Sequence, residues 1–311
     1  MSRLQEIVQR FPIRKSREQK DAFLRYAVSA AKAMGFTARV EENGRDGKHR
    51  NFVAGAPDSA PVIFTAHYDT PANMLLPNLI IPRNLPLFFA YQLLVVGMLA
   101  ALCLGAAFLA YLLFRQQSAA AITFLLLYYG LLFLMMQGPA NKNNVNDNTS
   151  GVASVLRLME LLPEEARGQA AFVLFDNEEK GRLGSKAFAV QHPQVKKNTL
   201  VINMDCVGVG EHLLIIAKNY ARALGDPALL QQVFSPDGCV TPHFFPSSGI
   251  TMNSDHKSFR RGVGIVACKR RKWVGYYTPC IHTRRDTRAS DGNIEYLAQN
   301  LAKFVKSLAE V

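Results

Sequence analysis

Five short segments of the chain carry side chains that can bind a metal ion or transfer a proton. Two of them offer a histidine and three offer carboxylates: His67, Asp147, the pair Glu178 and Glu179, Asp205 and His282. Imidazole nitrogens and carboxylate oxygens suit zinc, and cobalt or manganese can replace zinc at such sites. The five segments together therefore predict a metal site with nitrogen and oxygen ligands.

Each segment taken alone also has an ordinary structural explanation. His67 is followed two residues later by Asp69, which could hold the second ring nitrogen of the histidine, but such a pair is usually a polar strand end. Residues 146–151 suit the start of a helix, because Asn, Asp, Ser and Thr are preferred capping residues. Adjacent glutamates such as Glu178 and Glu179 usually lie on a solvated surface. The metal interpretation therefore depends on whether the fold brings the segments together.

The candidate residues follow short apolar runs that predict buried strands. These runs are residues 61–66, 170–175 and 200–204. Further strands are expected at residues 37–40, 51–54, 213–217 and 263–268, and helices at residues 18–34, 151–162, 219–234 and 290–308. This alternation predicts an α/β fold, a three-layer sandwich around a mostly parallel mixed sheet. Such sheets bind their ligands beyond the carboxyl ends of the strands, where the candidate residues fall.

A long apolar stretch interrupts this pattern between His67 and Asp147. Residues 84–114 carry no charge, and after Arg115 the chain is again uncharged to residue 141. About 20 apolar helical residues cross the hydrocarbon core of a bilayer. We therefore expect two membrane spans, at about residues 87–114 and 119–136, joined by a short link; the alternative is a pair of helices in a soluble core. The predicted organisation is a discontinuous catalytic domain, residues 1–83 and 138–311, interrupted by a transmembrane hairpin at residues 84–137.

The motifs stand in an order that resembles the di-zinc aminopeptidase family. They are residues 65–69, 146–153, 178–185, 203–205, 254–256 with Phe259, and 282–283 with 286–287. The family includes bacterial leucine aminopeptidases, aminopeptidase Y, glutamate carboxypeptidase II and the glutaminyl cyclases. The resemblance covers the chain from about residue 18 to its end, apart from the apolar hairpin.

The resemblance implies two zinc ions per chain. By this resemblance, His67 and Asp205 hold one ion, Glu179 and His282 hold the other, and Asp147 bridges both. Two cations roughly 3.5–4 Å apart can polarise a carbonyl, and zinc lowers the pKa of a water molecule that it binds to about 7.

The resemblance also assigns catalytic roles to two acids and one peptide bond. Glu178 would take a proton from the attacking water and return it to the leaving amine, and Asp69 would orient His67. Relatives carry a cis peptide bond after the bridging aspartate. We therefore expect a cis bond between Asp147 and Asn148.

The chain departs from the family where relatives stabilise the oxyanion. Several relatives place a tyrosine just before the last histidine or in the loop near Ser254, whereas Ile281 and Met252 stand in those neighbourhoods here. Tyr276 or Tyr277 could take this role. The departure concerns substrate preference more than metal binding.

The function that the resemblance implies is that of a membrane-anchored zinc metallopeptidase. We expect an aminopeptidase that removes N-terminal residues from small peptides. Two alternatives remain open. One is another enzyme on the same scaffold, such as a glutaminyl cyclase, a carboxypeptidase or an amidase, and the other is a non-catalytic membrane protein that keeps the fold for binding. The filled ligand positions favour an enzyme.

The net charge of +12 needs an explanation. Lysines and arginines gather late in the chain, at Arg260, Arg261, Lys269, Arg270, Arg271, Lys272, Arg284, Arg285 and Arg288. No nucleic-acid-binding module accompanies them, so we expect no nucleic-acid partner. Anionic lipid headgroups or acidic peptides are the expected partners, and a merely solvated basic face is the alternative.

Three features predict a catalytic domain on the cytoplasmic side of a membrane. Residues 1–17 are charged and lack the apolar region of a signal peptide. The five cysteines have no paired spacing, which fits a reducing compartment. Arg83, Lys142 and Arg157 lie on the domain side of the spans, whereas only Arg115 lies in the link, and cytoplasmic flanks carry the excess of Lys and Arg.

Overall fold

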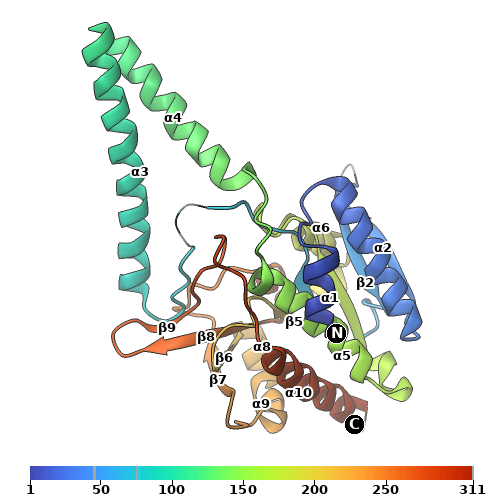
Figure 1. Cartoon of the computed structure of the whole chain (residues 1–311). Coiled ribbons are helices and arrows are strands. Elements are labelled where there is room, and N and C mark those ends of the chain that lie inside the picture. Colours follow the sequence, from blue (N-terminus) through green and yellow to red (C-terminus); the bar gives the residue numbers. More distant parts are fainter. Residues whose placement is uncertain (45–46, 75, 77, 310–311) are drawn as a thin grey trace.

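The computed structural model describes residues 1–44, 47–74, 76 and 78–309. Its α/β core is built around a mixed sheet, from which a helical hairpin projects (Figure 1). The strands are β1 (Ala38–Asn43), β2 (His49–Ala54), β3 (Val62–His67), β4 (Ala170–Phe175), β5 (Leu200–Met204), β6 (His212–Ala217), β7 (Thr241–Pro246), β8 (Gly262–Arg271) and β9 (Gly275–Tyr277). Their order is β1-β2-β4-β3-β5-β8-β6-β7, with β9 paired to β8.

The centre of the sheet is parallel, as the sequence predicts. Strands β4, β3, β5 and β8 run in one direction, while β2 and β6 are antiparallel to their neighbours β4 and β8. Every residue of β3, β4 and β5 is buried, which is typical of parallel strands covered on both faces. The edge strand β7 was not predicted, because Pro242 and Pro246 lack the backbone N–H that a central strand needs.

Helices cover both faces of the sheet and make the third layer. They are α1 (Arg3–Arg10), α2 (Arg17–Ala33), α5 (Gly151–Leu161), α6 (Leu183–Gln191), α7 (Pro193–Lys197), α8 (Asn219–Ala223), α9 (Asp226–Val233) and α10 (Asp291–Ala309). Buried side chains of α1, α2, α5 and α10 pack on one face, and those of α6 and α7 on the other. The expected helix at residues 219–234 is split at Gly225, whose φ of 81° is in the left-handed region. The three-layer α/β expectation is confirmed.

Two long helices leave the core. Helix α3 (Leu85–Phe114) and helix α4 (Gln117–Gln137) are long and apolar enough to cross a membrane, and they extend the predicted spans by a few residues. Only 17% of the most apolar window of α3 and 0% of that of α4 is buried inside the protein, unlike the helices of a soluble core. The two helices meet at the link, where Arg115 adopts a φ of 54°, and they diverge towards the core (Figure 1).

Both ends of this helical hairpin are attached to the core. The Asn84 side chain accepts a hydrogen bond from the Leu87 amide at the start of α3 and donates one to the Val274 carbonyl, each 3.2 Å long. After α4, the Gly138 carbonyl accepts a hydrogen bond of 2.7 Å from the Lys15 ammonium group. The core segments before and after the hairpin therefore lie on the same side of it.

Candidate metal centre

The predicted metal ligands converge beyond the carboxyl ends of three parallel strands. His67 is the last residue of β3, Asp205 follows β5 directly, and Glu179 lies in the turn after β4. Asp147 comes from the segment before α5, and His282 from the loop before α10. Because β4, β3 and β5 are adjacent and parallel, their ends meet at one edge of the sheet. The fold thus brings together all five residues.

Asp147 lies between two groups of candidate ligands. Its Oδ1 is 3.3 Å from Nε2 of His67, which is itself 3.7 Å from Oδ1 of Asp205. Its Oδ2 is 3.0 Å from Nε2 of His282, which is 3.2 Å from Oε2 of Glu179. Within each group, one ligand atom from every residue lies within 4.8 Å of the others. One carboxylate oxygen of Asp147 therefore faces each group, as a bridging ligand requires.

A carboxylate from the C-terminal loop positions Asp147. The two oxygens of Asp286 accept hydrogen bonds from the backbone amides of Asn146 and Asp147, at 2.9 and 3.0 Å. Burial raises the pKa of Asp286 to about 7. The peptide bond between Asp147 and Asn148 is cis, which confirms the expectation taken from the family resemblance. The sequence motif contains Asp286, but sequence analysis gave it no role.

Asn148 caps the helix that follows Asp147, and the same side chain joins this segment to the end of β5. Ser150, the residue before α5, makes no capping hydrogen bond with its side chain. Instead the Asn148 side chain accepts hydrogen bonds from the Gly151 and Cys206 amides, both 3.1 Å, and donates one of 3.0 Å to the Met204 carbonyl. A Cβ at Gly151 would collide with that carbonyl and with Asn148, so only glycine fits. This segment thus fixes Asp147 next to the end of β5.

Asp69 contacts both the histidine and the glutamate turn. Its Oδ1 lies 3.5 Å from Nδ1 of His67. Its two oxygens also accept hydrogen bonds from the backbone amides of Glu178 and Glu179, at 3.0 and 3.3 Å. Asp69 therefore links β3 to the turn after β4, a contact that the sequence pattern did not predict.

The electrostatics of the cluster are dominated by buried acids. Burial raises the pKa of Glu178 well above its usual value, and the nearby carboxylates of Asp255 and Glu179 raise it further. Burial likewise raises the pKa of Glu179 to about 8. Burial lowers the pKa of His282, but the adjacent Glu179 and Asp147 outweigh it and raise this pKa to about 9. The acids are thus close enough to disfavour one another's ionised form.

The residues present fit a divalent cation. Among the described residues, Oε1 of Glu179 is buried and has no hydrogen-bond partner. Buried carboxylates without a counter-charge are costly, and a cation between them would favour their ionised form. Nitrogen and oxygen donors in this mixture suit zinc.

Sequence analysis missed a buried arginine that supports the site. Arg14 has no exposed surface, and its guanidinium donates hydrogen bonds to the Tyr68 carbonyl and, at 3.0 Å each, to the side chains of Asn144 and Thr149. Burial lowers the pKa of Arg14 to about 10, while the charges of Asp69 and Asp147 oppose this shift. Its partners are far away in sequence, so no local pattern marks Arg14 among the other charged residues of the N-terminal segment.

The two tyrosines proposed for the oxyanion have other contacts. Tyr276 packs against the rings of His212 and His243, with centroids 5.4 and 5.3 Å apart. The ring of Tyr277 lies under the guanidinium of Arg271. An oxyanion role for either tyrosine stays a prediction.

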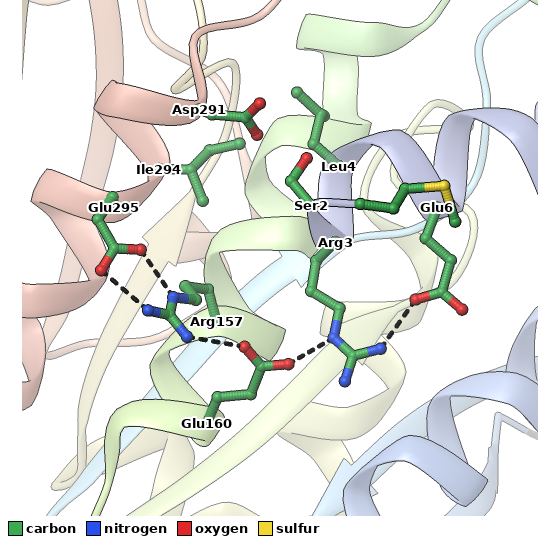
Figure 2. A pocket seen from close by; sticks show the side chains of 10 residues that line it. Ser2, Arg3, Leu4, Glu6, Arg157, Glu160, Asp291, Ile294 and Glu295 are labelled. Carbon is green, nitrogen blue, oxygen red and sulfur yellow. Dashed lines mark hydrogen bonds and ion pairs between the residues drawn. The ribbon is translucent and has the colours of Figure 1, made fainter.

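A cavity of 570 Å³ lies away from the candidate ligands, between α1, α5 and α10 (Figure 2). Its two arginines pair with glutamates that line it. Arg3 binds Glu160 at 2.5 Å, and Arg157 binds Glu160 at 3.0 Å and Glu295 at 2.7 Å. These pairs attach α1 to the core, and we assign the cavity no ligand.

Comparison with solved structures identifies proteins of the same fold. The LapA aminopeptidase of Legionella pneumophila has a TM-score of 0.57 at 15% identity, covering 99% of this chain and 70% of that chain. A Zn-dependent exopeptidase from Parabacteroides distasonis has a TM-score of 0.59 at 15% identity, covering 97% and 94%. The glutaminyl cyclase of Porphyromonas gingivalis has a TM-score of 0.57 at 14% identity, covering 98% and 96%.

Sequence comparison gives the family. A search of curated proteins found no match. A family model described as peptidase family M28 matches residues 135–305, more than half of the chain, and this range contains every predicted ligand except His67. The chain therefore belongs to peptidase family M28 and is a zinc metallopeptidase.

Proposed function

We propose that the chain is a membrane-anchored aminopeptidase that binds two zinc ions. The observation that carries the proposal is the position of Asp147, whose two oxygens face two separate groups of ligand atoms. His67 and Asp205 would hold one ion with Asp147, and Glu179 and His282 would hold the other. Two structural neighbours, an aminopeptidase and a zinc-dependent exopeptidase, support the choice of exopeptidase chemistry.

Glu178 is the proposed general base. Bound zinc supplies polarisation of the scissile carbonyl and a lowered pKa for water. Glu178 has a carboxylate oxygen in a group with His67 and Glu179, and Asp69 accepts a hydrogen bond from its backbone amide, which holds the turn in place. It would take a proton from the attacking water and donate it to the leaving amine.

The hairpin of α3 and α4 is the proposed membrane anchor. Large apolar side chains are exposed along both helices, among them Leu93, Leu102, Phe108, Leu126 and Phe133. Water contact with so much apolar surface is unfavourable, whereas lipid contact is not. Because Lys and Arg flank the spans on the domain side, we propose that the catalytic domain faces the cytoplasm and that the link at Arg115 faces outside.

The position of the metal centre supports apolar or membrane-derived peptides as substrates. Met136, in the last turn of α4, lines the same small pocket as Asp69 and Glu179. If α4 spans the bilayer, this pocket lies close to the membrane surface. A peptide that resides in the lipid interface could then present its N-terminus to the site without leaving the membrane.

Peptide hydrolysis by the purified full-length chain in detergent tests the activity. We expect release of the first residue from peptides with a free N-terminus and none from N-acetylated versions of the same peptides. Activity should disappear with a chelator and return with zinc. Peptides with an N-terminal glutamine provide the matched control, because ammonia release without loss of a residue would identify a glutaminyl cyclase instead. Release of the last residue would identify a carboxypeptidase.

Cysteine labelling on intact cells tests the orientation. Cys239 is exposed on the catalytic domain, so the native chain already carries a reporter there. The second reporter is Gln116→Cys in a Cys239→Ser background. A membrane-impermeant thiol reagent should label position 116 and not Cys239, and the reverse pattern would contradict a cytoplasmic active site.

A further inference from the structure

The turn between β8 and β9 presents an exposed tryptophan. The last residues of β8 pair with β9, Lys269 with Tyr277 and Arg271 with Gly275, so residues 272–274 form the tip. Trp273 is 85% exposed and is the one tryptophan of the chain. Large aromatic side chains are usually at least partly buried, so an exposed tryptophan at the tip of a hairpin indicates a contact surface.

Basic side chains surround this tryptophan. Lys269, Arg270, Arg271 and Lys272 are all exposed, and no acidic residue occurs anywhere in residues 262–285. Three of them lie over aromatic rings: Arg270 over Tyr276, Arg271 over Tyr277 and Lys272 over Trp273, at 5.3, 5.8 and 5.5 Å from the ring centroids. The tip therefore combines an aromatic side chain with four basic residues, the composition of segments that bind anionic membrane surfaces.

The tip lies where α3 leaves the core. The side chain of Asn84, which caps α3, donates a hydrogen bond of 3.2 Å to the Val274 carbonyl in the turn. A second connection follows, because the Thr278 amide donates a hydrogen bond of 3.0 Å to the Ile80 carbonyl. Figure 1 shows the β8–β9 hairpin in orange beside the core end of α3. A tryptophan at this point is level with the start of the proposed span, where membrane proteins concentrate tryptophan.

We propose that the β8–β9 turn is a second membrane contact, in which Trp273 enters the lipid interface and Lys269, Arg270, Arg271 and Lys272 bind anionic phospholipid headgroups. The proposal rests on the membrane location of α3 and α4 proposed above. A lipid surface is favoured over an acidic peptide because the hydrogen bond between Asn84 and Val274 fixes the turn beside the first turn of the span. This second contact, added to the helical hairpin, would hold the catalytic domain in one orientation on the bilayer.

Fluorescence of the single tryptophan tests the proposal directly. The full-length chain is reconstituted into phosphatidylcholine vesicles with and without phosphatidylglycerol, and each mixture is also prepared with lipids brominated close to the headgroup. We expect Trp273 emission to shift to shorter wavelength in vesicles and to be quenched by the brominated lipids, with stronger quenching when phosphatidylglycerol is present. Emission at the wavelength of solvent-exposed tryptophan, without quenching, would overturn the proposal.

A relocated tryptophan is the matched control. The variant Trp273→Phe with Leu229→Trp moves the fluorophore to α9, on the part of the core distant from the helical hairpin (Figure 1). Its emission should be insensitive to brominated lipid. Equal quenching at both positions would show non-specific vesicle contact and would also overturn the proposal.

Charge reversal distinguishes a local contact of the turn with headgroups from an effect of the net positive charge of the chain. Arg271→Glu with Lys272→Glu should abolish the effect of phosphatidylglycerol on Trp273 quenching. Lys196→Glu with Lys197→Glu, an exposed pair on α7, makes the same change in net charge and should leave the effect intact. The same loss in both variants would overturn the role of the turn.

Alkaline carbonate extraction of the vesicles tests separately whether the helical hairpin is inserted and whether the β8–β9 turn contacts lipid. A chain that remains inserted but has an unquenched Trp273 overturns the second contact alone. A chain that is fully extracted overturns the membrane anchor and, with it, this inference.

Discussion

The metal centre buries polar side chains, whereas the helical hairpin exposes apolar ones, and both are the reverse of the usual distribution. At the metal centre, the side chains of His67 and Asp147 are only 1% and 5% exposed, although both carry charge or strong polarity. In the hairpin, Leu93 and Leu126 are 72% and 71% exposed, although both are apolar. Charged groups are rarely buried without a partner, and large apolar patches are rarely left in water.

This difference in exposure indicates which kind of partner each region can bind. Buried carboxylates that raise one another's pKa fit a cation, whereas an uncharged apolar surface fits hydrocarbon. The two regions touch near Met136, which lines a pocket with Asp69 and Glu179. A polar cluster of candidate ligands therefore lies next to an apolar helical hairpin.

The largest expected effect comes from removing a metal ligand. We expect two zinc ions per chain in protein prepared without chelator. His67→Ala and His282→Ala should each lower the zinc content and abolish peptide hydrolysis, because each removes the imidazole of one group. Metal analysis and activity assays of the purified variants measure this. His243→Ala is the control, since this histidine belongs to neither ligand group. Full zinc content in both ligand variants would contradict the assignment.

The second effect separates chemistry from metal binding. Glu178→Gln should reduce kcat by roughly 10²–10⁴, because an amide cannot accept the proton. Its zinc content should stay at the wild-type level, since Glu178 is not in either group around Asp147. A near-normal kcat would remove Glu178 as the base, and loss of zinc would instead make it a ligand.

The third prediction tests the apolar region with a single charge. A lysine near the middle of a membrane span costs about 2.5–3.5 kcal/mol on insertion scales. Leu102→Lys in α3 should therefore lower the fraction of the chain found in membranes after expression. Leu224→Lys, at a comparably exposed position outside the hairpin, should leave that fraction unchanged. Equal distribution of both variants would indicate that α3 lies in water.

The smallest effect concerns a histidine remote from both regions. His192 lies between two acids, with Nε2 2.7 Å from Glu41 and Nδ1 2.9 Å from Asp58. Burial lowers its pKa, but these acids outweigh burial and raise it above the usual value. Protonated His192 therefore stabilises the folded chain. This contribution is fully present below about pH 6.5, the pKa of an unperturbed histidine, and is lost as the pH rises through the raised pKa of His192 in the folded state.

Thermal unfolding of His192→Asn measures this effect. The variant should be less stable than wild type by roughly 0.5–1 kcal/mol at low pH, because Asp58 is largely exposed and its contribution is screened. The difference should shrink at alkaline pH. A difference that is the same at both pH values would mean that packing of His192 against Phe188, rather than charge, is responsible.

Local sequence signals predicted the sheet and the segments that carry the candidate ligands, because both depend on short stretches of the chain; the ligand roles themselves stay a prediction. The apolar runs before His67, Glu178 and Asp205 are strands, and parallel pairing alone brings their ends together. The supporting contacts could not be predicted in this way. Arg14 binds Asn144 and Thr149, more than 100 residues away, and the carboxylate of Asp286 reaches back to the Asp147 amide. Such contacts are set by the packed fold rather than by any periodicity.

Weak local signals account for the elements that sequence analysis missed. Helix α1 begins with a capping box between Ser2 and Gln5, which is visible in the sequence but short. Strand β7 contains two prolines and lies at the sheet edge. The boundaries of the catalytic domain at residues 83 and 138 stay a prediction, although the apolar helices begin and end close to them.

The insertion point of the hairpin has a consequence for the biogenesis of the enzyme. Both ligand groups around Asp147 need this residue, and it lies after the hairpin in the chain, whereas His67 lies before it. During synthesis from the N-terminus, the ribosome must release α3 and α4 before Asp147 emerges. A nascent chain therefore cannot bring its candidate ligands together until α3 and α4 have been synthesised, and a chain with the proposed topology would mature into a peptidase only at the membrane.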